Sequence, residues 1–232
     1  MIDKKTRRRA RLRSALIAIP LVTAGLLGAT GTAPAQAATA PSLTCLGQGI
    51  DPTAKLHHET QTFIRAPLST VWNLHTDVTG WPSWQSAVTS MNKLDPGPLH
   101  PGSRFRWTTP APATASTPAT TLVVTSTVQQ VRPEQCIRWS GPAIGDGLRI
   151  DRGIHVWNFS KVRGGVIVRT EESWTGAQIE SDPATAIKYL APGLDAWLAD
   201  LKAAAEARAC FVDVRDRAEP GTVGPWDVIT RD

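Results

Sequence analysis

Two ionisable side chains in the second half of the chain have types and positions suited to proton transfer. His155 lies within a strand-like run, and Glu172 shares the parity of Val166, Val168 and Thr170 in the next such run. Alternate strand positions face the same side, so both groups can face an apolar interior. Burial raises the pKa of a carboxyl group, and histidine exchanges a proton near neutral pH. The pair therefore suggests an acid and a base acting on an enolisable or hydroxylated substrate.

The same residues have a structural interpretation, which we favour. Glu171 or Glu172 would pair with an arginine across the sheet, and His155 would satisfy a hydrogen bond in the core. The arginines considered are Arg104, Arg106 and Arg169. On this interpretation the protein binds a ligand without catalysing a reaction.

Other chemical motifs are lacking in the sequence. We interpret the remaining histidines, His57, His58, His75 and His100, as surface residues without partners at useful spacing. No Cys-x-x-Cys pair occurs, and no His stands at a zinc-ligand distance from a Cys, so we expect no metal. The Gly-x-Ser-x-Gly and Gly-x-x-x-x-Gly-Lys patterns are also lacking, which argues against hydrolase and nucleotide-binding functions. We expect no cofactor.

The basic charge of the chain is concentrated at its start. The 232 residues carry a formal charge of +5, but seven of the 25 Lys and Arg and one of the 20 Asp and Glu lie in residues 1–37. The remainder has 18 basic and 19 acidic residues, so we expect no nucleic-acid partner.

Hydrophobic residues make up 41%, which excludes a disordered chain, and nine of the 14 aromatic residues are Trp.

Residues 1–37 have the three parts of a secretory signal peptide. A positive run precedes the apolar stretch Ala15 to Leu27, and Ala35-Gln36-Ala37 forms a small-residue cleavage site. The stretch is too short for a membrane span, which needs about 20 residues. We expect cleavage after Ala37, secretion by the Sec or the twin-arginine route, and no stable membrane insertion afterwards.

The three cysteines remain in the mature chain. Secretion exposes Cys45, Cys136 and Cys210 to an oxidising environment, where one disulfide can form. Spacing does not choose among the three pairings, and buried thiols are an equal alternative.

The mature chain has the element order of an α+β domain. A first strand over 55–65 precedes a helix from Pro67 toward Gly80 and a short helix from Pro82. A helix begins at Ser181 or Asp182, has its apolar residues three or four apart, and continues to about Ala209. The strands between them are predicted at Ala87–Leu94, Ser103–Thr108, Thr120–Val131, Cys136–Gly141, Leu148–Phe159 and Val166–Trp174. We divide the chain into the signal peptide 1–37, a flexible lead-in 38–54, one domain 55–210 and a tail 211–232.

Several motifs in this order resemble one known family. They are Ile64-Arg65-Ala66-Pro67-Leu68-Ser69-Thr70-Val71-Trp72, Trp81-Pro82-Ser83-Trp84, Gly102-Ser103-Arg104-Phe105-Arg106-Trp107, His155-Val156-Trp157, Thr170-Glu171-Glu172-Ser173-Trp174 and Trp197-Leu198-x-x-Leu201-Lys202. The chain resembles the polyketide cyclase/dehydrase-like group of the START-like, helix-grip superfamily (SRPBCC) over about Lys55 to Ala209. The resemblance implies a curved antiparallel sheet of about six or seven strands around a long C-terminal helix, with a ligand cavity between them.

The resemblance also implies a set of cavity-lining residues. We expect a small hydrophobic ligand, lipid-like or polyketide-like, to contact Trp72, Trp84, Phe105, Trp107, Trp139, His155, Trp157, Thr170, Glu172, Leu194 and Trp197. Our first hypothesis is a secreted, monomeric carrier. The alternatives are a cyclase/dehydratase-type enzyme using His155 and Glu172, and a domain with a filled interior that acts by contacting another protein.

Overall fold

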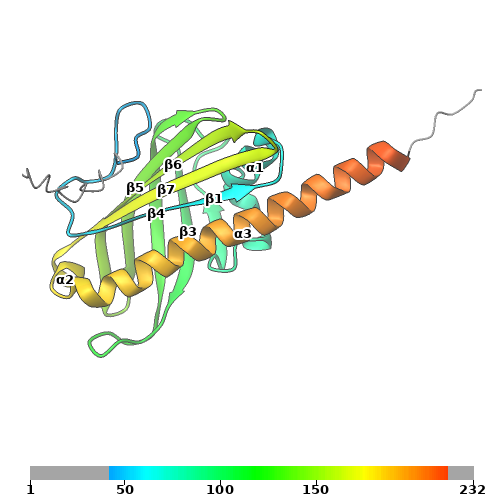
Figure 1. The fold of residues 1–232 in the computed structure, drawn as a ribbon. Helices are drawn as coiled ribbons and strands as arrows, with labels where there is room; N and C mark the ends of the chain where they lie inside the picture. The colour runs from blue at the N-terminus through cyan, green and yellow to red at the C-terminus, as the bar shows by residue number, and fades with distance from the viewer. Residues whose placement is uncertain (1–41, 219–232) are drawn as a thin grey trace, which may run out of the picture. The chain divides into compact units, whose positions relative to one another are not determined.

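The computed structural model describes residues 42–218, with side chains to residue 210, so the predicted signal peptide lies outside the described residues. It contains a seven-stranded sheet and a long C-terminal helix (Figure 1). The strands are β1 (Leu56–Ile64), β2 (Ser90–Lys93), β3 (Arg104–Ala111), β4 (Thr120–Arg132), β5 (Cys136–Gly145), β6 (Leu148–Val162) and β7 (Gly165–Thr175). The helices are α1 (Leu68–Thr76), the 3-10 helix η1 (Val78–Ser83), α2 (Ala177–Glu180) and α3 (Pro183–Ala218).

The strands pair antiparallel in the order β1-β7-β6-β5-β4-β3-β2. Strands β2 to β7 follow one another as a meander, and β1 adds at the end beside β7. Helix α3 crosses one face of this sheet (Figure 1). The predicted helix-grip fold is therefore confirmed. We call the face toward α3 the inner face and the opposite one the outer face.

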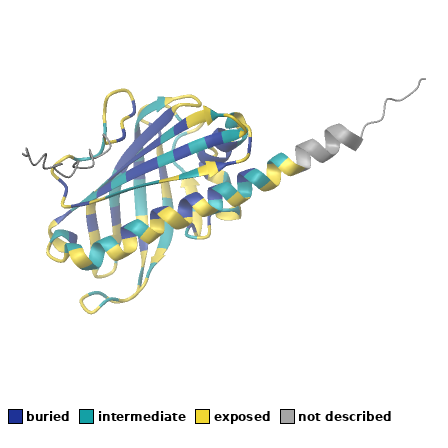
Figure 2. Ribbon diagram, viewed as in Figure 1, coloured by how far each residue is buried: buried dark blue, intermediate teal, exposed yellow. Residues whose placement is uncertain are grey.

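Helix α3 is positioned by its apolar stripe. Asp182 accepts a hydrogen bond from the backbone N–H of Thr185 at 3.0 Å, which satisfies one of the free donors at the helix start. The buried residues recur three or four apart and are Leu190, Leu194, Trp197, Leu198, Leu201 and Ala205. Figure 2 shows this buried side along α3. The helix ends at Ala218 rather than near Ala209, so it includes the start of the predicted tail, and residues 219–232 lie outside the described residues.

Helix α1 corrects our interpretation of His75. We predicted a surface residue, but His75 is fully buried, because the inner side of α1 packs against β6. Its ring lies 4.3 Å from Trp157 and 5.3 Å from Phe159, measured between ring centroids. The helix predicted from Pro82 is also wrong, since the chain forms η1 over Val78–Ser83 instead.

Residues 42–54 belong to the segment that we predicted as a flexible lead-in. In the structure they pack on the outer face, where Leu43 and Cys45 are buried with Val156. The backbone N–H of Leu43 donates to the carboxylate of Glu171 at 2.7 Å. Buried polar groups require such partners, and here the sheet supplies them.

A disulfide joins this N-terminal segment to β5. It links Cys45 to Cys136, one of the three pairings that the sequence left open. Cys210 is a free, exposed thiol. The bond closes a loop with a sequence separation of 91 and ties the segment to the middle strand of the sheet.

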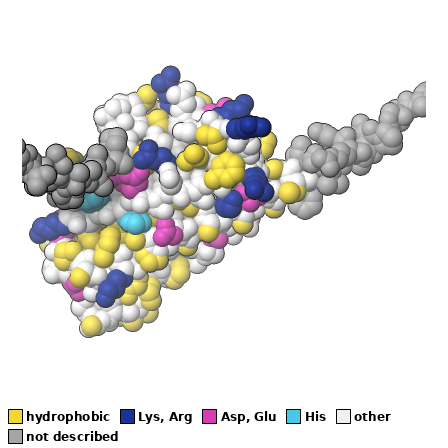
Figure 3. Space-filling view, viewed as in Figure 1, with side chains coloured by type: hydrophobic (Ala, Val, Ile, Leu, Met, Phe, Trp, Pro, Cys, Tyr) yellow, Lys and Arg dark blue, Asp and Glu magenta, His cyan; other side chains and the backbone are white. Residues whose placement is uncertain are grey.

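The surface drawn in Figure 3 has Lys and Arg side chains spread among other residue types rather than gathered in one patch. Among residues 42–218, no helix has both the length and the apolar character needed to cross a membrane. In the same part of the chain, no three His, Cys, Asp or Glu side chains gather in a way that would hold a metal ion.

Candidate ligand-binding site

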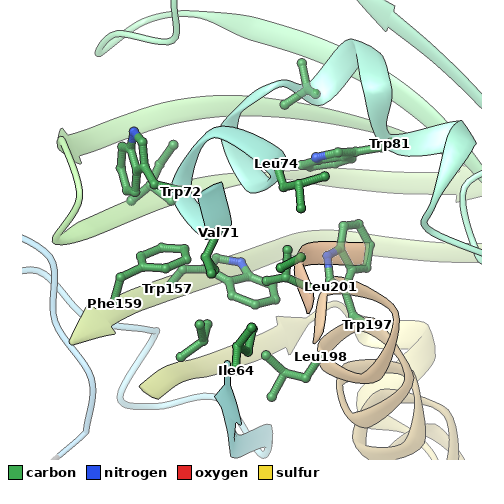
Figure 4. Close-up of a cluster of buried hydrophobic side chains, with 14 of the residues drawn as sticks. Ile64, Val71, Trp72, Leu74, Trp81, Trp157, Phe159, Trp197, Leu198 and Leu201 are labelled. Atoms are coloured by element: carbon green, nitrogen blue, oxygen red, sulfur yellow. The ribbon is translucent and has the colours of Figure 1, made fainter. Parts of the chain in front are cut away.

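The interior between sheet and helix has a filled part and an open part. In the filled part, Val71 and Trp72 of α1 meet Trp157 and Phe159 of β6, with Leu201 of α3 nearby (Figure 4). The Trp72 and Phe159 rings pack edge to face with their centroids 5.3 Å apart. This end of the molecule is therefore a solid aromatic core.

The open part is a cavity of about 440 Å³ toward α2 and the N-terminal half of α3. Its walls come from β3 to β7, α2, α3 and the loop between β3 and β4. The apolar lining includes Trp107, Leu122, Val124, Trp139, Ala143, Leu148, Ile150, Trp174, Ile179, Leu190, Leu194 and Trp197. Ligand pockets usually enclose about 300–1,000 Å³, so the space is large enough for a small molecule.

Small residues at inner positions explain why this part is open. Gly141 of β5 and Gly153 of β6 are register partners, and both line the cavity. Ala143 follows on β5, after a register shift next to Gly141. A Cβ at Gly141 would lie 1.8 Å from the carbonyl oxygen of Thr125, so only glycine allows β4 and β5 to approach this closely.

The structure places six of the predicted ligand contacts on the cavity wall, namely Trp107, Trp139, His155, Glu172, Leu194 and Trp197. The other five lie elsewhere. Trp72, Phe105 and Trp157 are buried in the aromatic core, and Trp84 packs against it. Thr170 is fully buried behind the wall, where it contacts His155. The inward parity predicted for three strand pairs is confirmed. One member of each pair lines the cavity, namely Trp107, Trp139 and His155. The other member lies in the core on the same face, namely Phe105, Ile137 and Trp157.

Thr170, which lies on the side of His155 away from the cavity, positions its ring by a hydrogen bond. The Nε2 atom of His155 lies 2.7 Å from Oγ1 of Thr170, and that hydroxyl lies 3.2 Å from the carbonyl oxygen of Val156. Burial lowers the pKa of His155 well below its usual value, and the neighbouring His75 contributes in the same direction. His155 is therefore neutral near pH 7.

Glu172 is the acidic group beside His155. Its Oε1 atom accepts a hydrogen bond from the indole N–H of Trp174 at 2.9 Å, and its Oε2 atom lies 3.7 Å from Nδ1 of His155. Burial raises the pKa of Glu172 to about 7, although the bond from Trp174 acts in the opposite direction. Both the protonated acid and the carboxylate are therefore accessible near neutral pH.

The ion pairs that we favoured for this region are not formed. Arg104 pairs with Asp95, and Arg169 pairs with Glu59. Arg106 contacts the hydroxyl of Thr125. Glu171 instead binds the N-terminal segment on the outer face, through Ser42 and Leu43. Glu172 has no arginine partner in the part of the chain that the structure describes, which leaves it facing His155 in the cavity.

Sequence reasoning missed the residues that make the cavity open. We followed large aromatic side chains, whereas the space depends on Gly141, Ala143 and Gly153. The sequence does contain a pattern that could have predicted the open space. Gly141 and Ala143 alternate with Trp139 on one strand, and Gly153 alternates with His155 on the next, so small residues share the inward-facing positions. Trp174, which binds Glu172, belongs to a motif that we had identified but was not assigned to the site.

A seven-stranded antiparallel sheet, a long C-terminal helix and an apolar cavity between them define the helix-grip class of hydrophobic-ligand-binding proteins. The chain belongs to the family described as polyketide cyclase / dehydrase and lipid transport, whose model matches residues 55–206. A search of curated protein sequences found no match.

Solved structures share this fold at low sequence identity. TTHA0849 from Thermus thermophilus is 18% identical with a TM-score of 0.51, and the match covers 66% of this chain and 99% of that one. The di-domain ARO/CYC StfQ from the steffimycin biosynthetic pathway is 18% identical with a TM-score of 0.50, over 67% of this chain and 52% of that one. This chain thus corresponds to about half of StfQ.

Proposed function

We propose that this protein is a carrier that holds a small hydrophobic molecule in the cavity without changing it chemically. The observation that carries the proposal is the apolar cavity of about 440 Å³, next to a core that is otherwise packed solid. His155 is neutral near pH 7 and the pKa of Glu172 is raised to about 7, so an apolar ligand meets little fixed charge from these two groups.

The driving force for such binding is removal of apolar surface from water. At about 25 cal/mol per Å², a ligand that buries roughly 200 Å² gains about 5 kcal/mol before the cost of association. The tryptophans of the wall supply large, flat contact surfaces. No charged anchor is needed for this.

The experiment is titration with a neutral fluorescent probe, N-phenyl-1-naphthylamine. We expect the wild-type protein to bind it, and Ala143→Phe, which places an aromatic ring inside the cavity, to lose at least about tenfold in affinity. The matched control is Ile144→Phe on the same strand, because Ile144 is 43% exposed and points away from the cavity. Equal binding by both variants would overturn the proposal.

We also propose that the carrier is secreted after cleavage behind Ala37. The signal-like residues 1–37 support this, and so does the Cys45–Cys136 disulfide, which persists in an oxidising compartment. Edman sequencing of the protein from the culture medium should begin at Ala38. A cell-associated protein that still begins at Met1 would contradict export.

A cyclase/dehydratase-type activity is the second candidate, and the 3.7 Å separation between Glu172 Oε2 and His155 Nδ1 favours it. Nδ1 would remove a proton from the carbon next to a carbonyl group while Oε2–H protonates the carbonyl oxygen. The C–H electrons then form the C=C bond of an enol, and the C=O π electrons form the new O–H bond. Both protons are accounted for, and no co-reactant is required.

Hydrogen exchange tests this activity. 2-Tetralone in D₂O should exchange its α-hydrogens faster with the wild-type protein than with Glu172→Gln or His155→Phe. A wild-type rate equal to that without protein, under conditions where 2-tetralone is bound, would exclude this activity.

A further inference from the structure

The hydrogen bonds behind His155 determine which ring nitrogen carries its proton. Thr170 has one hydroxyl proton, and the carbonyl oxygen of Val156, 3.2 Å away, can only accept it. The Thr170 oxygen is then the acceptor for His155 Nε2–H at 2.7 Å. Nδ1 therefore carries a lone pair, and among residues 42–210 it has no hydrogen-bond partner.

The hydrogen bond to Glu172 determines the position of its proton in the same way. Oε1 already accepts the indole N–H of Trp174 at 2.9 Å, so in the protonated acid the hydrogen lies on Oε2. Oε2 is the oxygen that faces His155. The cavity wall thus presents one donor, Glu172 Oε2–H, beside one acceptor, His155 Nδ1.

These two atoms do not satisfy each other. They are 3.7 Å apart, beyond the range of a hydrogen bond. His155 is 5% exposed, but its Nδ1 atom is not among the fully buried atoms that lack a partner, so Nδ1 is accessible from the cavity. An acceptor that faces a largely apolar cavity has few other partners there, which means that a ligand group able to donate to it is favoured.

We propose that the ligand is an apolar molecule with a hydroxyl group, an alcohol, phenol or enol, whose oxygen accepts a hydrogen bond from Glu172 Oε2–H and donates one to His155 Nδ1. The inference rests on the proposed ligand-binding function. Two hydrogen bonds of about 2.8 Å can meet at one oxygen when the outer atoms are less than about 5.6 Å apart, and the observed separation lies within that limit. An ether or ketone oxygen only accepts, so it leaves Nδ1 unpaired.

The test compares 2-naphthol, 2-methoxynaphthalene and naphthalene by calorimetric titration of the mature protein at pH 6. We expect 2-naphthol to bind at least about tenfold more tightly than its methyl ether. Equal affinity of the two would overturn this inference while the carrier function stands. If none of the three binds, the carrier function itself fails.

Variants locate the preference on the two side chains. Glu172→Leu and His155→Phe should bind 2-naphthol and its methyl ether about equally, while naphthalene still binds. Glu172→Gln should keep most of the preference for 2-naphthol, because an amide also donates a hydrogen bond. The matched controls are Asp195→Leu and His100→Phe at exposed positions, which should keep the full preference. A preference that survives both Glu172→Leu and His155→Phe would place the hydroxyl elsewhere and overturn the proposal.

A separate readout checks the proton assignment. ¹⁵N NMR of the ligand-free protein should show His155 with hydrogen on Nε2, and Thr170→Val should weaken this preference while naphthalene binding remains. Hydrogen on Nδ1 in the wild-type protein would contradict the proposal.

Discussion

Gly141 of β5 lies directly opposite Gly153 of β6, and both face the cavity. Their surroundings differ. A Cβ at Gly141 would meet the backbone oxygen of Thr125 at 1.8 Å, whereas a Cβ at Gly153 would meet its nearest neighbour, Glu172 Oε1, at 3.4 Å. One glycine is required by backbone approach, and the other leaves space for the ligand.

Because of this difference, we expect substitution by alanine to destabilise the fold at Gly141 but not at Gly153. Gly141→Ala should lower the free energy of unfolding by about 2 kcal/mol or more, because β4 must move. Gly153→Ala should change it by less than about 1 kcal/mol and weaken ligand binding instead. Urea unfolding of both variants checks the prediction, and equal destabilisation would contradict it.

Ligand binding should depend on pH through Glu172. Since its pKa is raised to about 7, the donor form dominates below that pH and is lost above it. The affinity for 2-naphthol should therefore fall about tenfold between pH 6 and pH 8.

Glu172→Gln is the control that isolates this titration. The other titratable groups around Glu172 are His155 on β6, His58, which is its register partner on β1, and Asp182 at the start of α3. All three are unchanged in the variant, so a pH dependence that persists in Glu172→Gln would assign the effect to one of them.

His75 should make the fold sensitive to acid. Burial lowers its pKa from 6.5 to about 3, so below pH 6.5 the unfolded chain binds a proton that the folded chain excludes. The stability contributed by neutral His75 is complete above pH 6.5 and decreases as the pH falls toward 3. The loss should reach up to about 1.4 kcal/mol per pH unit.

His75→Leu tests this account, because both ring nitrogens of His75 are buried without partners and an apolar side chain fits the same surroundings. At pH 7 the free energy of unfolding of His75→Leu should lie within about 1 kcal/mol of the wild-type value. Between pH 7 and about pH 4.5 this free energy should fall less in His75→Leu than in the wild-type protein. His100→Leu, in an exposed loop, should behave like the wild-type protein. Identical acid profiles for His75→Leu and the wild-type protein would refute the assignment.

The disulfide should stabilise the fold by restricting the unfolded chain. Replacing both Cys45 and Cys136 by Ala should lower the free energy of unfolding by about 2–4 kcal/mol, because the bond closes a long loop. Cys210→Ala should have no effect, since this thiol is exposed and unpaired. The opposite ranking in urea unfolding would show that the pairing is different.

Much of the fold could be predicted because its signals are local. Alternation gave the strands and the inward parity of Trp139 and His155, and the cap and apolar spacing gave α3. The position of the cavity was not local information. It depends on which strands pair, since the register places Gly153 of β6 opposite Gly141 of β5, where both line the cavity.

Burial of polar residues was also beyond local reasoning. His75 has the sequence neighbours of an ordinary helix residue, and only the packing of α1 on β6 makes it a core group. Glu171 and Glu172 are adjacent in sequence, yet the pleat places them on opposite faces, one under the N-terminal segment and one in the cavity. Their different partners follow from tertiary contacts.

Native mass spectrometry of the mature protein purified from its own host tests the central claim most directly. We predict that the wild-type protein and Ile144→Phe retain a small hydrophobic compound that organic extraction releases, and that Ala143→Phe, with an aromatic ring inside the cavity, retains much less of it. A wild-type protein that carries no compound and binds no neutral apolar probe, or a compound that Ala143→Phe retains equally, would contradict ligand binding in the cavity.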